Sequence, residues 1–306
     1  MAFAGTEYEE VCGWSPACAA VVGDYIVAVN NRGTVPSGST LPSSTHAIFN
    51  TATNTARIFS GLDNYNKLGH GAVGYDGKVW VCQDGSGLVG TPKFQSINPA
   101  TGAVTDYDEY DANRAIVAAA GRIWFVSVTS LKAYEISSDT MGSPIGGYSN
   151  ITGWAAANDD RIIIGHGTTS TPIQITAFNA TTGAVIATTA TPITASAAGR
   201  GAVIGSHVYF RTTGGLYRYN WSTYAIDFIP TTPTGFPGTD PLNATIAGPD
   251  GYIYGLSPTA PYQITVIDPA TGSWQVDDAP TVRSRRLPMV LGPDGYLWVP
   301  TGEPLG

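Results

Sequence analysis

One short phrase recurs along the chain at a nearly constant interval. It is a turn rich in glycine and aspartate followed by a largely apolar strand, as in Gly77-Lys-Val-Trp-Val81. Successive copies start 39 to 54 residues apart, a spacing typical of the blades of a β-propeller, each a sheet of four strands. The copies start at Gly23, Gly77, Gly121, Asp160, Ser206, Gly251 and Gly295.

A second turn keeps the same phase and follows an apolar strand in each case. It occurs as Asn98-Pro-Ala-Thr-Gly102, Asn179-Ala-Thr-Thr-Gly183 and Asp268-Pro-Ala-Thr-Gly272, with a degraded form at Asn50-Thr-Ala-Thr-Asn54. Asn, Asp and Gly tolerate the positive φ that tight turns require. Each blade is therefore predicted to run strand A, Asp-Gly turn, strand B, loop, strand C, Asn/Asp turn, strand D.

These two turns predict an all-β fold. We expect residues 1–306 to form a single β-propeller domain of about seven four-stranded blades. A stacked β-solenoid is the alternative, although its repeats are usually shorter. Only six C–D pairs can be counted, so residues 6–11 are expected to add a strand that closes the last blade. Without that strand the last blade has an open edge, which a partner chain could fill by strand addition.

Composition narrows the choice of partners. Charged residues are 12% of the chain and the net charge is −8, with basic residues clustered only at Arg283, Arg285 and Arg286. A nucleic-acid partner is not expected, because phosphate binding needs grouped Lys and Arg. No apolar run is long enough to span a membrane, and the first ten residues do not resemble a secretory signal. Cys12 and Cys18 could form a disulfide or remain thiols.

The clearest copies resemble a known group of propeller repeats. Gly248-Pro-Asp-Gly-Tyr-Ile-Tyr254, Gly292-Pro-Asp-Gly-Tyr-Leu-Trp298 and Ile267-Asp-Pro-Ala-Thr-Gly272 are similar to the repeats of streptogramin-lyase-like and NHL-like proteins. The resemblance covers the blade scaffold and implies fold rather than chemistry. Streptogramin lyases hold a metal at the propeller mouth, but the Trp-Phe-Thr-Glu continuation of that family is missing here. No catalytic residue is therefore carried over.

A weaker resemblance is compositional. The chain is rich in Thr, Gly and Ala and poor in Lys, which is similar to bacteriophage virion proteins, such as tail or capsid-associated components. This implies a location in a virion or facing the extracellular space. Otherwise the chain is expected in the cytoplasm.

Candidate site residues fall where strand A begins and strand B ends, the end of a propeller that usually forms its mouth. Two histidines stand in Gly-His-Gly sequences there and suggest a metal or anion site. Polar loops whose glycines serve turns are the simpler interpretation, because no carboxylate accompanies the histidines in a ligand spacing. We therefore predict a binding site without a metal, a cofactor or a catalytic residue. Its candidate residues are His70, Asp84, His166, Arg200 and Arg211.

The seven tryptophans offer a second route to a ligand. Stacking on a cell-surface glycan is one interpretation, and packing in the blade core is the other. Trp80, Trp124 and Trp298 share one position in strand B, which favours the core for these three.

Two functions remain open from the sequence. The first is a non-catalytic recognition or assembly module, such as a phage virion component, with a protein partner or further copies of itself. The second is a metal-dependent lyase or hydrolase at the propeller mouth, in which His70 and His166 would be ligands.

Overall fold

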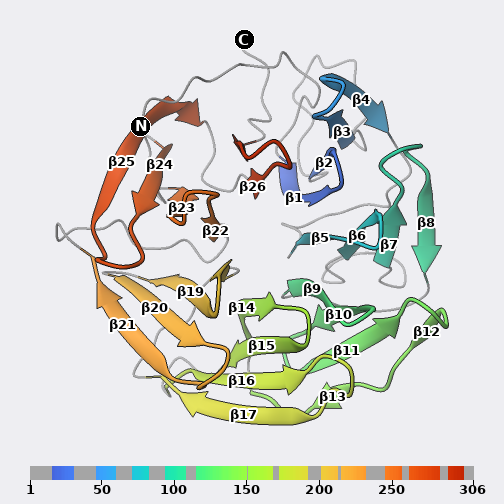
Figure 1. Ribbon diagram of the computed structural model, residues 1–306. Coiled ribbons are helices and arrows are strands. Elements are labelled where there is room, and N and C mark those ends of the chain that lie inside the picture. The colour runs from blue at the N-terminus through green and yellow to red at the C-terminus, as the bar shows by residue number, and fades with distance from the viewer. Residues whose placement is uncertain are drawn as a thin grey trace, which may run out of the picture.

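The computed structural model describes strands and turns arranged as a ring of small sheets around a central opening (Figure 1). All regular elements in the described part are strands. The described residues are 16–30, 46–59, 71–82, 94–107, 115–149, 151–167, 172–191, 201–212, 215–231, 245–256, 262–282 and 289–299.

Six sheets have at least four strands, paired antiparallel in chain order from the centre outward. Blade 1 contains β1 (Pro16–Val22), β2 (Tyr25–Asn30), β3 (His46–Asn50) and β4 (Thr55–Phe59). Blade 2 contains β5 (Ala72–Tyr75), β6 (Lys78–Cys82), β7 (Phe94–Ile97) and β8 (Val104–Tyr107). Blade 3 contains β9 (Ala115–Ala119), β10 (Arg122–Val126), β11 (Ser130–Glu135) and β12 (Thr140–Met141), and β13 (Ile145–Gly146) also pairs with β11.

The next three blades follow the same order. Blade 4 contains β14 (Ile151–Ala157), β15 (Arg161–His166), β16 (Gln174–Asn179) and β17 (Val185–Ala190). Blade 5 contains β18 (Ala202–Ile204), β19 (His207–Thr212), β20 (Gly215–Asn220) and β21 (Ile226–Pro230). Blade 6 contains β22 (Thr245–Ala247), β23 (Ile253–Leu256), β24 (Tyr262–Ile267) and β25 (Trp274–Val282).

A two-stranded sheet occupies the position after blade 6. Its strands are β26 (Val290–Leu291) and β27 (Leu297–Trp298), and Figure 1 shows β26 between β22 and β1. Trp298 packs against Phe49 of blade 1, with ring centroids 4.6 Å apart. The prediction of about seven four-stranded blades therefore needs correction, since the described residues form six such blades and this smaller sheet. The strand expected at residues 6–11 lies outside the described residues.

Both predicted turns join the strands that the sequence assigned to them. Asp76 and Gly77, with φ of 51° and 69°, form the A–B turn of blade 2, and positive φ at both central residues suits a hairpin between twisted strands. In the C–D turns, Asn98 and Asn179 accept backbone N–H groups through their side-chain oxygens. One position of each C–D turn has positive φ, and it is held by Asn54, Gly102, Asp139, Gly183, Tyr224 and Gly272.

The core is divided into layers between consecutive sheets. In β10, Ile123 and Phe125 pack against blade 2, whereas Trp124 and Val126 pack against blade 4. Alternate residues of a strand point to opposite faces, so a strand buried on both faces is apolar along its whole length. Such layers join each sheet to the next, including β26–β27 to blades 6 and 1. The short charge-poor strands therefore require the ring to bury their two apolar faces.

In the described part of the chain, no helix is long and apolar enough to cross a membrane.

Candidate functional site

Two of the residues predicted to lie at the propeller mouth, His166 and Arg211, are at the ends of B strands, next to the B–C loops. His166 is the last residue of β15, and Arg211 is the next-to-last residue of β19. The other three candidates, His70, Asp84 and Arg200, lie outside the described residues. Their place in a site at the mouth stays a prediction.

His166 packs in the layer between blades 3 and 4. Its ring centroid lies 4.9 Å from that of Tyr148, and its Nε2 lies 2.8 Å from the hydroxyl of Thr176. The residue is 8% exposed, and burial lowers the pKa of His166 below 6.5. A neutral imidazole is the form that binds metals, but the contacts of this ring are those of a residue packed between sheets.

Arg211 lies in the layer between blades 5 and 6. Its residue is 2% exposed, and burial lowers the pKa of the guanidinium from 12.5 to about 10. A Cβ added at Gly255 would come within 2.2 Å of the Arg211 Nη1, so the missing side chain of this glycine makes room for the guanidinium. Because His166 and Arg211 occupy different layers, the structure does not bring them into one cluster. Among the described residues, no three His, Cys, Asp or Glu side chains are grouped so that they could hold a metal ion.

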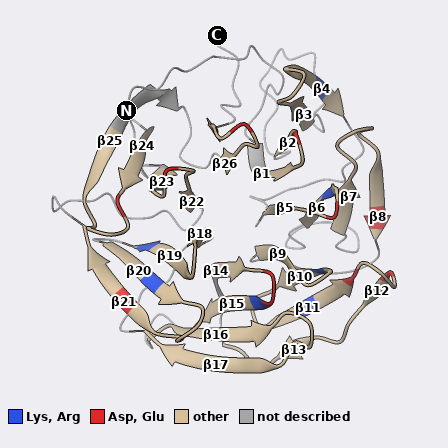
Figure 2. Cartoon of the chain, viewed as in Figure 1, with Lys and Arg blue, Asp and Glu red and all other residues tan. Residues whose placement is uncertain are grey.

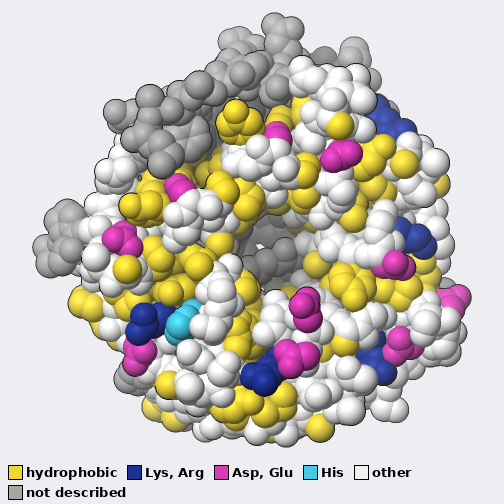
Figure 3. All heavy atoms as spheres, in the orientation of Figure 1, with side chains coloured by type: hydrophobic (Ala, Val, Ile, Leu, Met, Phe, Trp, Pro, Cys, Tyr) yellow, Lys and Arg dark blue, Asp and Glu magenta, His cyan; other side chains and the backbone are white. Residues whose placement is uncertain are grey.

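The opposite end of the blades carries the A–B and C–D turns. Figure 3 shows that this face is hollowed at its centre, and Figure 2 shows acidic residues at the tips of several A–B hairpins around the opening. The carboxylates serve their own turns. Asp250 accepts the Tyr252 N–H and the Tyr254 hydroxyl, while Asp294 accepts the Tyr296 N–H and the Trp298 indole N–H.

An arginine joins each of two blades to the C–D turn of the next. Arg122 donates from Nη1 to the carbonyl of Ala180 at 3.3 Å, and Arg161 donates to the carbonyl of Trp221. Each is the first residue of its B strand, and each acceptor follows the asparagine that opens the turn. Arg161 also lies over the Tyr224 ring, 5.6 Å from its centroid. These arginines fill the space between a blade and the next turn.

Blade 1 makes the same connection with a different residue. Its B strand begins with Tyr25, and the arginine comes from the outer strand, where Arg57 donates from Nη2 to the Pro99 carbonyl. Pro99 follows Asn98, so its carbonyl holds the same turn position as the acceptors in blades 4 and 5. Because the arginine of blade 1 comes from the outer strand and not from strand B, it does not fill the space beside Tyr25. That space is an open pocket.

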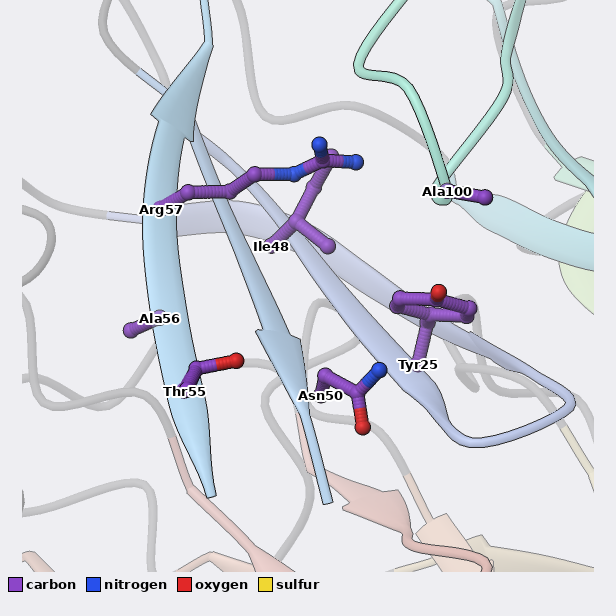
Figure 4. A pocket seen from close by; sticks show the side chains of 7 residues that line it. All are labelled: Tyr25, Ile48, Asn50, Thr55, Ala56, Arg57 and Ala100. Carbon is purple, nitrogen blue, oxygen red and sulfur yellow. The ribbon is translucent and has the colours of Figure 1, made fainter. Parts of the chain in front are cut away.

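This pocket has a volume of about 180 Å³ and lies between the sheet of blade 1 and the C–D turn of blade 2. In Figure 4, Arg57 reaches from β4 across Ile48 toward the turn that carries Ala100, and the Tyr25 ring lies below that turn. The pocket is lined by Tyr25, Ile48, Asn50, Thr55, Ala56, Arg57 and Ala100.

Local hydrogen bonds orient the polar groups of the pocket. The Oδ1 of Asn50 accepts the Thr53 N–H at 3.0 Å, which places its amide nitrogen on the side of the Tyr25 ring (Figure 4). The hydroxyl of Thr55 lies 2.7 Å from that of Thr53. The phenol ring of Tyr25 thus lies beside an amide, a hydroxyl and a guanidinium, a combination suited to binding a polar ligand.

Sequence reasoning did not single out this pocket. The signal was present in the residue that follows each A–B turn, because a tyrosine there cannot make the arginine contact of blades 3 and 4. Blades 6 and 1 and the two-stranded sheet all carry tyrosine at this position. The residues, in chain order, are Tyr25, Lys78, Arg122, Arg161, His207, Tyr252 and Tyr296.

Compared with known proteins, the sequence matches no family model and no curated protein sequence. Its structure is similar to the crystal structure of the computationally designed Ika8 protein, with a TM-score of 0.55 and 13% sequence identity over 94% of this chain and 96% of that one. At this identity the similarity shows the fold alone. The ring of sheets is thus a propeller arrangement, and no relative supports the resemblance to lyases, NHL proteins or virion proteins.

Proposed function

We propose that this protein is a non-catalytic recognition or assembly module built on a β-propeller. The observation that carries the proposal is the pocket beside Tyr25, which offers aromatic, amide, hydroxyl and guanidinium groups on an accessible face. These groups bind and orient a ligand by stacking and hydrogen bonding. The two described candidates from the other face, His166 and Arg211, are buried in interblade layers, where they support the ring.

The proposal extends to the setting of the module. We place it in a phage virion or on another surface facing the extracellular space, with a protein partner, further copies of itself or a cell-surface glycan as the target. Residues 1–306 would act as one propeller domain. The low charge of the chain supports this assignment, since a weakly charged surface suits contact with other chains.

The alternative is a metal-dependent lyase or hydrolase at the mouth, with His70 and His166 as ligands. It would require His166 to exchange its contacts with Tyr148 and Thr176 for a metal. No observation in the described residues favours that exchange. Replacing both histidines by alanine would abolish metal binding if this alternative held.

Native mass spectrometry of the purified chain, prepared without chelators, tests the proposal. We expect a metal-free oligomer, or a mass that includes a partner. A monomer that carries one divalent metal per chain and turns over a small substrate would overturn the proposed function. The variant His70→Ala/His166→Ala is the control that assigns any bound metal to the mouth.

A further inference from the structure

We propose that the pocket beside Tyr25 binds one sugar residue of a glycan. This inference rests on the proposed function and names the ligand class of its site. A pyranose ring has a face of C–H groups that can lie on an aromatic ring and a rim of hydroxyls that need hydrogen-bond partners. The pocket supplies both, with the Tyr25 ring on one side and the polar groups of Asn50, Thr55 and Arg57 around it.

The lining is rich in donors. Asn50 directs its amide nitrogen toward the pocket because its Oδ1 is held by the Thr53 N–H. Arg57 carries five N–H donors, and the Pro99 carbonyl accepts from its Nη2. A ligand that presents several acceptor oxygens therefore fits, and sugar hydroxyls or a sugar carboxylate meet that requirement.

Other small ligands fit less well. Phosphate groups are bound by grouped cations or backbone N–H groups, whereas Arg57 is the one cation among the lining residues. An apolar ligand would leave the amide, hydroxyl and guanidinium groups without partners, which costs binding free energy. The volume of about 180 Å³ is smaller than the ~300–1,000 Å³ of pockets that enclose drug-sized ligands, so it suits one ring of a longer chain.

The pocket arises from a break in the repeat. In blade 3, the first residue of strand B is Arg122, which pairs with Glu135 at 2.5 Å and also reaches the next turn. In blade 1, Tyr25 and Asn50 stand directly opposite each other where Arg122 and Glu135 stand in blade 3. An uncharged aromatic and an amide thus replace an ion pair, and the space that the arginine would fill becomes accessible to a ligand.

Saturation-transfer difference NMR with free monosaccharides tests this assignment. The probes are glucose, galactose, N-acetylglucosamine, rhamnose, glucuronic acid and N-acetylneuraminic acid. We expect at least one to receive signal on its ring C–H protons, with a Kd on the order of 1 mM for so small a ligand. The Tyr25→Ala variant should lose at least about tenfold in affinity.

Tyr296→Ala is the matched control. Tyr296 also follows an A–B turn and is 71% exposed, but it does not line the pocket, so its removal should leave sugar binding unchanged. Urea midpoints of both variants show whether the fold is retained. Arg57→Gln should weaken glucuronic acid more than glucose if the carboxylate is the bound group, and both equally if hydroxyls are bound.

The absence of transfer to every probe, or binding that survives Tyr25→Ala in a folded variant, would overturn the sugar assignment. That result would leave the proposed function standing if native mass spectrometry still shows an oligomer or a bound partner. A metal-bound monomer with turnover would instead remove the proposed function, whatever the sugars do.

Discussion

Acid should destabilise this protein through one buried histidine. His46 opens β3, is 2% exposed and packs against Phe59 with ring centroids 5.2 Å apart. Burial lowers the pKa of His46 from 6.5 to about 4. The unfolded chain therefore binds a proton at this site at a higher pH than the folded chain does, and stability falls as the pH drops from 6.5 toward 4.

The size of the effect follows from that difference in pKa. Each unit is worth about 1.4 kcal/mol, so the shift from 6.5 to about 4 corresponds to at most roughly 3 kcal/mol. Between about pH 7 and about pH 4.5, His46 alone should lower the free energy of unfolding by about 2 kcal/mol. Below about pH 4 its contribution should level off, because both states are then protonated.

Urea unfolding followed by tryptophan fluorescence at a series of pH values measures this contribution. Trp80 and Trp124 are 1% and 2% exposed, so their emission should report on loss of the interblade layers. His46→Phe keeps an aromatic ring and removes the titrating group. The relevant quantity is the difference in the free energy of unfolding between the wild-type protein and this variant. The effects of acid on other groups, His166 included, cancel in this difference.

His207→Gln is the control, because His207 bonds Ser206 and Asn220 at an A–B turn and lies outside the layer that contains His46. This variant should keep the fall in the free energy of unfolding that His46 causes between about pH 7 and about pH 4.5. If the free-energy difference between wild type and His46→Phe stays constant from about pH 7 to about pH 4.5, the assigned burial of a neutral imidazole is wrong.

Two further substitutions test the layers between blades. Gly255→Ala would place a Cβ 2.2 Å from Arg211 and should lower the free energy of unfolding by about 1–3 kcal/mol, whereas Gly146→Ala meets nothing nearer than 3.9 Å and should be close to neutral, as chemical denaturation will show. Arg161→Gln removes the bond to the next blade and should cost about 1–2 kcal/mol, while Arg218→Gln removes an exposed pair with Asp227 and should cost less than about 1 kcal/mol. If urea titrations show that Arg161→Gln and Arg218→Gln lower the free energy of unfolding equally, the interblade bond adds no more stability than a surface ion pair.

The turns could be predicted from the sequence because their chemistry is local. Asp76-Gly77 and the turn that starts at Asn179 have positive φ and side-chain bonds that follow from their own residues. The C–D turn that ends at Tyr224 does not match the predicted turn sequence, because tyrosine, with a φ of 60°, holds the position that glycine holds in the clearest copies. Contacts with the rest of the structure, such as Arg161 over its ring, stabilise a conformation that its residue type does not suggest.

The candidate site could be predicted less well, for a geometrical reason. The period of the repeat places His166 near the end of its strand, as the sequence indicated, but the direction of its side chain depends on the packing of Tyr148 and Thr176. These contacts join segments outside the repeated phrase. The count of four-stranded blades was also too high, because the phrase identifies A–B hairpins, and the last hairpin is described without strands C and D.

The pocket beside Tyr25 arises without a change in the scaffold of the blade. Every blade needs the same turns and apolar strands, so substitutions there would cost the stability of the ring. The first residue of strand B is less constrained, because either Arg122 or Tyr25 lets its strand pair with both neighbours. In blade 3 the arginine at this position joins two blades, and in blade 1, where tyrosine stands, Arg57 makes the connection from the outer strand. The interblade bond and the pocket that we propose as a ligand site are therefore alternative uses of one position, and this explains why the pocket lies in blade 1 and not in blades 3 and 4.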